Sequence, residues 1–124
     1  MPYEFNIDHE RRLVIRKTWG VFTETELASA REEYASIPEI KRYHELFDFL
    51  EVTAYEVRSR TITSLGLADS SLPRDFSDKK IALVALQNSV VWGLLRMYSS
   101  YENGATAEFR MFGNLIEAES WLAE

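Results

Sequence analysis

With 124 residues, of which 46% are hydrophobic and 27% charged, the chain fits one globular domain over residues 1–124, and its lack of cysteine excludes disulfides, thiolate metal sites and cysteine nucleophiles. Its formal net charge of -6 repels phosphate backbones and its basic pairs at residues 11–12, 16–17 and 58/60 are scattered, so nucleic-acid binding is not expected. No signal-peptide pattern opens the chain and no apolar run reaches membrane-spanning length, so a cytoplasmic protein without membrane insertion is expected.

The first predicted elements are two strands and a helix. Residues 3–7 and 13–20 flank a polar turn, which predicts an antiparallel hairpin whose second strand ends at Gly20. Thr23 and Glu26 have the spacing of a capping box, so a helix is expected to begin there. Its apolar residues recur at three- and four-residue steps and predict the buried face, and Pro38 marks its end: Leu27, Ala30, Tyr34 and Ile37.

The middle of the chain predicts one clear strand and one ambiguous segment. Residues 46–50 are apolar around Asp48, which favours a buried third strand with Asp48 on the face opposite its phenylalanine neighbours. Beyond residue 52, either the strand continues through Tyr55 and Val57 or a loop follows, and a poor helix is predicted near residues 59–69.

The last third of the chain reads as strand, helix, strand and helix. The strands are predicted at residues 81–86 and 105–112, and the helices at 88–100 and 114–123, the second capped by Asn114. Its buried face is predicted to hold Leu115, Ala118, Trp121 and Leu122. The element order is then β-β-α-β-α-β-α-β-α, an α/β fold.

The helix at 88–100 has an unusually wide apolar surface. From Val90 to Tyr101 its apolar side chains span an arc of roughly 160° at 100° per residue, and Trp92 lies outside even that arc. Gly93 is expected to let the helix approach a neighbouring backbone. The surplus apolar surface predicts a protein interface, most simply between two copies of the chain, at Trp92, Leu95, Tyr98 and Tyr101. The alternative is that the loop at residues 72–76 covers it.

Four segments carry a family resemblance. Residues 81–86, Val-Trp-Gly-Leu-Leu-Arg-Met-Tyr at 91–98, Glu-Phe-Arg-Met-Phe at 108–112 and Glu-Ala-Glu-Ser-Trp-Leu at 117–122 resemble the C-terminal half of SpoIIAA-like, STAS-like bacterial domains. The resemblance implies a mixed, mostly parallel sheet of about five strands with an antiparallel N-terminal strand. Other relatives are similar to Sec14-type lipid-carrying domains, whose additional cavity-lining helices are missing here.

The resemblance also implies a form of regulation. The best understood members of the SpoIIAA-like family are anti-sigma factor antagonists, which a kinase switches by phosphorylating a serine just after the third strand. The matching residues 48–54 lack the serine pair and the glycine of that motif, so the phosphosite does not carry over. Thr53, the only hydroxyl there, is the candidate for a phospho-switch, and its alternative is a loop threonine that hydrogen-bonds its own backbone.

Motifs for catalysis or cofactor binding are not found in the sequence. His9 and His44 have no metal-ligand spacing, and there is neither a nucleophile elbow nor a glycine-rich phosphate loop. Paired carboxylates such as Asp48 and Glu51 have the chemistry of an acid and a base, but neighbouring acids are common in proteins. No metal, cofactor or catalytic residue is therefore expected.

Three functions follow, in order of preference. The first is a non-enzymatic protein-interaction or regulatory domain that works as a homodimer, or with another protein, through the face around Trp92. The second is a binding protein for a small apolar or lipid-like ligand held between the sheet and the helix at residues 89–101, with Met97 and the tyrosines as its lining. The third is an enzyme that uses Asp48 or Glu51.

Overall fold

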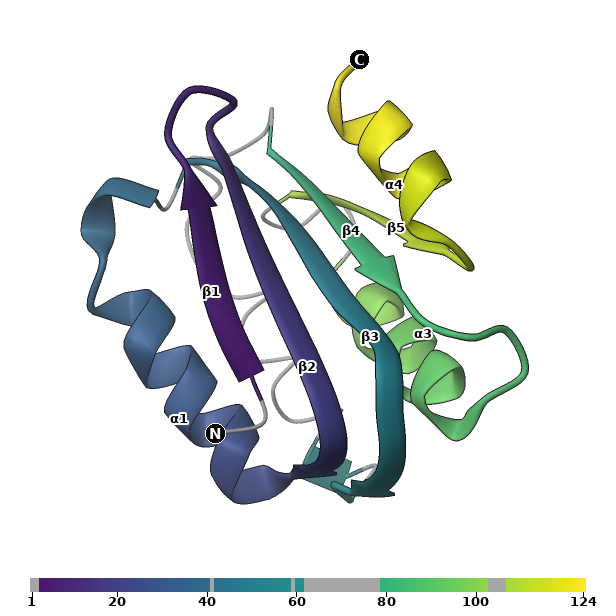
Figure 1. Ribbon diagram of the computed structural model, residues 1–124. Coiled ribbons are helices and arrows are strands. Elements are labelled where there is room, and N and C mark those ends of the chain that lie inside the picture. The colour runs from purple at the N-terminus through teal and green to yellow at the C-terminus, as the bar shows by residue number, and fades with distance from the viewer. Residues whose placement is uncertain (1–2, 41, 59, 62–78, 103–106) are drawn as a thin grey trace.

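The structure, a computed structural model, describes residues 3–40, 42–58, 60–61, 79–102 and 107–124, and of residues 100–102 only the backbone (Figure 1). The helix predicted near residues 59–69 lies almost entirely outside these ranges. The elements in chain order are β1 (Tyr3–Asp8), β2 (Leu13–Thr23), α1 (Glu24–Ala35), a 3-10 turn η1 (Pro38–Ile40), β3 (His44–Glu56), β4 (Lys80–Val84), α3 (Val90–Glu102), β5 (Glu108–Phe112) and α4 (Leu115–Leu122).

The five strands form one sheet in the order β1-β2-β3-β4-β5 (Figure 1). β1 pairs antiparallel with β2, from Tyr3 opposite Thr18 to Asp8 opposite Leu13, because the polar turn between them reverses the chain. The pairs β2–β3, β3–β4 and β4–β5 are all parallel. The predicted fold class, a mostly parallel sheet with an antiparallel N-terminal strand, is confirmed.

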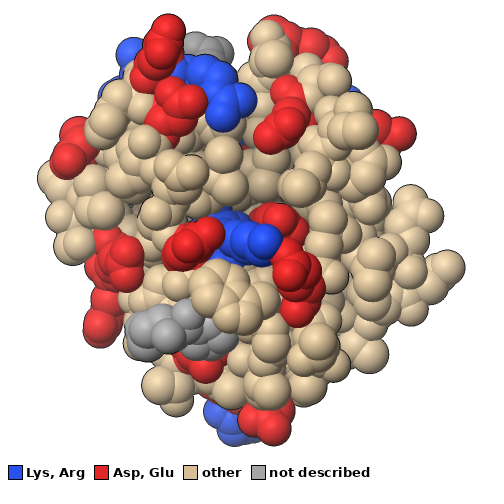
Figure 2. All heavy atoms as spheres, in the orientation of Figure 1, with Lys and Arg blue, Asp and Glu red and all other residues tan. Residues whose placement is uncertain are grey.

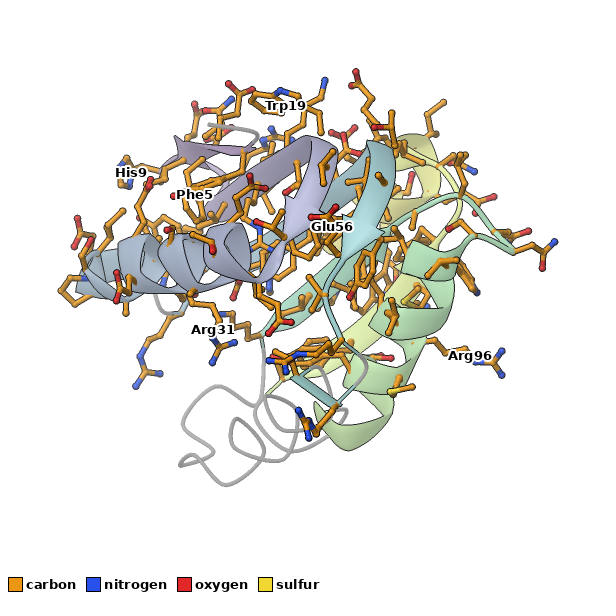
Figure 3. The ribbon with its side chains drawn as sticks, turned by 90° about the horizontal axis from the view of Figure 1, so that it is seen from below. Phe5, His9, Trp19, Arg31, Glu56 and Arg96 are labelled. Carbon is orange, nitrogen blue, oxygen red and sulfur yellow. The ribbon has the colours of Figure 1, made fainter. Side chains whose placement is uncertain are left out.

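Helices cover both faces of the sheet. Alternation along β3 directs Leu46 into a cluster with Trp121 of α4, and it directs Phe47 to the other face, where Phe47 packs with Leu95 and Tyr98 of α3. α1 lies on the same face as α3, since its Tyr34 hydroxyl donates to Glu45 of β3, two residues from Phe47. The molecule is therefore a helix layer, the sheet, and α4 on the opposite side (Figure 3).

β2 does not end at Gly20 as predicted but continues to Thr23. Gly20 has φ of +73°, a conformation that side chains disfavour, and the register with β3 shifts between Gly20 and Val21. A Cβ at this position would meet no described atom within 4 Å, so the backbone angle, and not space, requires glycine. The glycine thus bends a strand that its sequence pattern appeared to terminate.

β3 is also longer than predicted, since the apolar segment at residues 46–50 continues through Tyr55 to Glu56. Val52 and Ala54 pair with the consecutive residues Gly20 and Val21, which makes Thr53 the extra residue of a bulge. Thr53 is exposed and lies within the strand, whereas the sequence suggested a loop after the strand.

Both predicted helix caps are present. Thr23 Oγ1 accepts from the Glu26 backbone N–H at 3.2 Å at the start of α1, and Asn114 Oδ1 accepts from the Glu117 N–H at 2.9 Å at the start of α4. α4 buries Ala118, Trp121 and Leu122 as expected. Leu115, also predicted on this face, is not buried but 36% exposed.

α3 begins after Ser89, whose hydroxyl oxygen accepts from the Trp92 backbone N–H at 3.0 Å. Val91 is buried, but Val90 points outward, so the buried arc of the helix is narrower than its apolar sequence. The expected reason for Gly93 is wrong for the described structure, where a Cβ there would meet nothing within 4 Å.

Candidate functional site

Exposed aliphatic side chains gather where β4 and β5 end and the following helices begin. Of the five large hydrophobic side chains that are exposed in the described part of the chain, four lie on the β4–α3 and β5–α4 turns. We call them the aliphatic rim, and their exposed fractions run from 36% to 79%: Leu86 (59%), Val90 (69%), Leu115 (36%) and Ile116 (79%).

The two turns of the aliphatic rim are adjacent because β4 and β5 are parallel neighbours. The Ala85 backbone N–H donates to the Phe112 carbonyl at 3.1 Å, just where both strands end. One residue further, a Cβ placed on Gly113 would lie 3.4 Å from the Gln87 side chain. Chain segments that are 27 residues apart in sequence, Ala85 and Phe112, are thus held side by side.

The aliphatic rim is free of charge. Residues 85–95 and 111–116 contain no Asp, Glu, Lys or Arg, although 27% of the chain is charged. In Figure 2 the surface over the β4–α3 turn, to the right of the view, is correspondingly uncharged. A neutral aliphatic surface on a chain of net charge -6 is suited to contact with another apolar surface.

The predicted interface residues of α3 lie beside the aliphatic rim but pack inward. Trp92 is half-buried against the cluster around Phe22, Phe49 and Val91. Leu95 and Tyr98 are also half-buried, and the Tyr98 ring meets the Phe109 ring edge-on at 5.9 Å. The side chain of Tyr101 lies outside the described residues.

The open half of the sheet, on the α4 side, carries polar groups. A shallow hollow of about 300 Å³ is lined by Glu4, Lys17, Trp19 and Glu51, and Lys17 Nζ lies 2.5 Å from Glu51 Oε2 (Figure 2). Asp48 stands opposite Lys17 in the register, is buried, and accepts a hydrogen bond from the Leu50 N–H at 3.0 Å. Glu51 and Asp48 therefore contact different partners, and only Glu51 lines the hollow.

The other face holds a buried polar cluster under α1. Glu45 and Lys79 form an ion pair, and both are less than one-tenth exposed. Tyr34 joins them, because its hydroxyl donates to Glu45 Oε2 at 2.9 Å and lies 2.7 Å from Lys79 Nζ. Burial, together with the Glu45 carboxylate, raises the pKa of Tyr34, so its hydroxyl stays protonated as a donor.

Arg16 of β2 lies on the same face of the sheet, but no carboxylate of the described residues forms an ion pair with it. Its guanidinium lies over the rings of Phe47 at 4.2 Å and Phe49 at 5.6 Å. The side chain is 7% exposed, and its Nε is one of three buried side-chain atoms without a hydrogen-bond partner in the described structure, with Glu26 Oε2 and the Tyr55 hydroxyl. Burial lowers the pKa of Arg16 to about 10. No motif in the sequence marked this residue.

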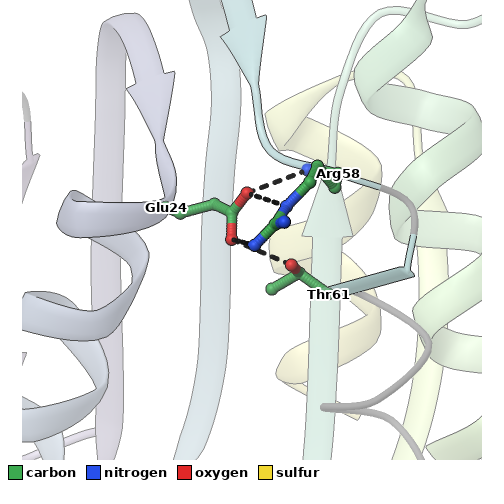
Figure 4. Close-up of polar contacts among 3 residues, drawn as sticks. All are labelled: Glu24, Arg58 and Thr61. Atoms are coloured by element: carbon green, nitrogen blue, oxygen red, sulfur yellow. Dashed lines mark hydrogen bonds and ion pairs between the residues drawn. The ribbon is translucent and has the colours of Figure 1, made fainter.

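The start of α1 is tied to the chain that follows β3 (Figure 4). Glu24 accepts from Arg58 Nε at 2.9 Å and Nη2 at 3.1 Å, and from the Thr61 hydroxyl at 2.9 Å. The hydrogen bond from Arg58 is the main reason that the pKa of Glu24 falls to about 2. This contact fixes the carboxyl ends of β2 and β3 against each other.

The two histidines have protein partners. His9 Nδ1 lies 2.9 Å from the Tyr43 hydroxyl, and His44 Nδ1 accepts from the Lys80 backbone N–H at 2.9 Å. Within the described ranges, no group of three or more His, Asp or Glu side chains has the arrangement of a metal site. None of the helices described is long and apolar enough to span a membrane.

A five-stranded sheet in this order, with one antiparallel pair and helices on both faces, is a SpoIIAA-like fold. The structure is similar to the crystal structure of an uncharacterized protein of the DUF3478 family with a SpoIIAA-like fold from Shewanella loihica PV-4, with a TM-score of 0.61. The likeness covers 97% of this chain and 93% of that chain at 16% identity, so it shows the fold. No protein-family model and no curated protein matches the chain.

Proposed function

We propose that the protein is a non-catalytic, cytoplasmic regulatory domain that works as a two-fold homodimer joined through the aliphatic rim. The observation that carries this proposal is the exposure of Leu86, Val90, Leu115 and Ile116, which all follow the carboxyl ends of two neighbouring parallel strands, β4 and β5. Trp92, predicted to form the interface, lies on the same helix as Val90 and is half-buried. Thr53 stays a predicted phospho-switch, on an exposed bulge of β3.

Charge favours a second copy as the occupant. Two molecules of net charge -6 repel each other across most of their surfaces, whereas residues 85–95 and 111–116 bring no charge to the contact. A two-fold axis sets the same patch against itself, so a neutral aliphatic surface is automatically complementary. The rim therefore matches a second copy better than a strongly charged partner.

The size of the rim sets the expected affinity. Burying each exposed aliphatic side chain contributes roughly 1.5–3 kcal/mol, and association itself costs several kcal/mol in lost freedom. Four such side chains are enough for a dissociation constant of about 1–100 μM, and not for an obligate dimer. The dimer is thus expected to form and dissociate readily.

Sedimentation velocity over about 1–500 μM, a range that brackets the micromolar affinity, tests the proposal. We expect the wild type to shift from monomer to dimer, and Val90→Asp and Ile116→Asp to stay monomeric, because each sets two like charges across the two-fold axis. Val21→Asp is the matched control, since Val21 is an exposed aliphatic residue, at 42%, on β2 away from the rim. A wild type that stays monomeric throughout, or a Val21→Asp variant that dissociates equally, contradicts the proposal.

A second candidate function is the binding of a small apolar ligand on the face of the sheet under α1 and α3. The observation that favours it is Arg16, a buried guanidinium whose Nε has no partner in the described structure. Proteins seldom bury a charge without pairing it, and such groups concentrate at binding sites.

A further inference from the structure

We propose that Arg16 is the receptor for the anionic group of a small amphipathic ligand that binds on the sheet face covered by α1 and α3. The inference rests on the second candidate function and adds to it the charge of the ligand and the residue that reads it. The ligand class is a single carboxylate or phosphate carried on an apolar body.

The position of Arg16 in the sheet is the first step. In the register it stands between Phe5 of β1 and Phe47 of β3, so the row across the strands is aromatic, cationic, aromatic. The guanidinium carbon lies over the Phe47 ring, 4.2 Å from its centroid, so the charge rests against an apolar surface.

The missing acid is the second step. The described structure contains no ion pair and no hydrogen bond to Arg16, and its Nε is fully buried. Glu45 is the acid whose charge acts most strongly on Arg16, but it is already engaged by Lys79 and by the Tyr34 hydroxyl. A buried guanidinium whose Nε has no acceptor costs free energy, which an incoming carboxylate or phosphate recovers through hydrogen bonds.

The side chains near Arg16 indicate that the remainder of the ligand is apolar. Phe47 lies under the guanidinium and packs, with Leu95 and Tyr98 of α3, against the cluster that holds Leu83 and Phe109. These side chains present apolar and aromatic surface with one polar tip. An amphiphile with an apolar chain and a single anionic end matches this combination.

The test compares decanoate with decanol, which share a chain and differ in charge, below the concentration at which decanoate forms micelles. Calorimetry and thermal melting are measured on the wild type and on Arg16→Met, which keeps the length and removes the charge. We expect decanoate to bind the wild type about ten- to a hundredfold more tightly than decanol, and Arg16→Met to bind both equally weakly. We also expect the free Arg16→Met variant to melt no lower than the wild type, since it loses an unpaired buried charge.

Each outcome decides a different claim. If decanoate and decanol bind the wild type equally, the ligand function stands and the role of Arg16 is wrong. If neither binds, both the second candidate function and this inference are wrong. Arg16→Lys is the variant to use if Arg16→Met does not fold, because it keeps the charge and loses the planar fork, and decanoate affinity unchanged in Arg16→Lys overturns bidentate recognition. A free Arg16→Met variant that melts well below the wild type overturns the proposal in favour of a purely structural arginine.

Discussion

The His44 imidazole joins two strands through its unprotonated nitrogen. Nδ1 accepts a hydrogen bond from the backbone N–H of Lys80, so His44, the first residue of β3, is linked to the first residue of β4. Burial, followed by the charges of Lys80, Lys79 and Arg12, lowers the pKa of His44 below its usual value of 6.5. No pattern in the sequence near His44 predicts this contact, because its partner Lys80 lies 36 residues away.

Acid should therefore weaken the fold through His44. A pKa that is lower in the folded protein means that the unfolded chain binds the proton more readily, so this contribution to stability is complete above about pH 6.5 and declines as the pH falls below it. We expect the melting temperature to drop between about pH 7.5 and pH 5.5, where carboxylates titrate little, and to drop less in His44→Gln. Equal pH dependence of the two proteins would show that His44 does not titrate with unfolding.

At the scale of the elements, the helix starts were predictable and the strand lengths were not. Thr23 and Asn114 cap α1 and α4 as expected, because a cap is decided by residues three positions apart. The extension of β2 past Gly20, and the bulge at Thr53, depend on how two strands 31 residues apart pair with each other. The residues next to Gly20 do not indicate that pairing. Gly20 was therefore predicted to end the strand, whereas β2 bends there and continues.

The cap of α4 gives a prediction at this scale. Asn114→Ala removes the acceptor for the Glu117 N–H, and the helix it starts holds Trp121 against the sheet. We expect a loss of about 1 kcal/mol in the free energy of unfolding by urea, whereas Asn114→Asp, which keeps an acceptor oxygen, loses little. Equal losses in the two variants would mean that the side-chain bond is not what stabilises the helix.

At the scale of the whole molecule, the sequence predicted surplus apolar surface on α3, with an interface at Trp92, Leu95 and Tyr98. In the structure these three side chains are half-buried against the core clusters, and Val90, at the start of the same helix, is the exposed one. Leu115 and Ile116 join Val90 only because β4 and β5 are neighbours, which periodicity along one helix does not reveal.

The neutrality of the aliphatic rim predicts how salt affects the proposed dimer. Two chains of net charge -6 repel at low ionic strength, and no opposite charges meet at the rim to be screened. We expect the dissociation constant from sedimentation to stay constant or decrease as sodium chloride rises from about 0.05 to 0.5 M, as the Debye length shortens. A marked increase would indicate a contact made by ion pairs and hence a different surface.

The spatial order of the strands follows the order in which they are synthesised, so each new strand adds to the edge left by the previous one and none has to be inserted between two others. α4 follows all five strands in the chain, and its Ala118, Trp121 and Leu122 pack over Leu46, Ala82 and Val84. A polypeptide that is still being synthesised therefore leaves these three side chains uncovered until residues 115–122 have emerged from the ribosome. During that interval an apolar layer is open to contacts with other chains.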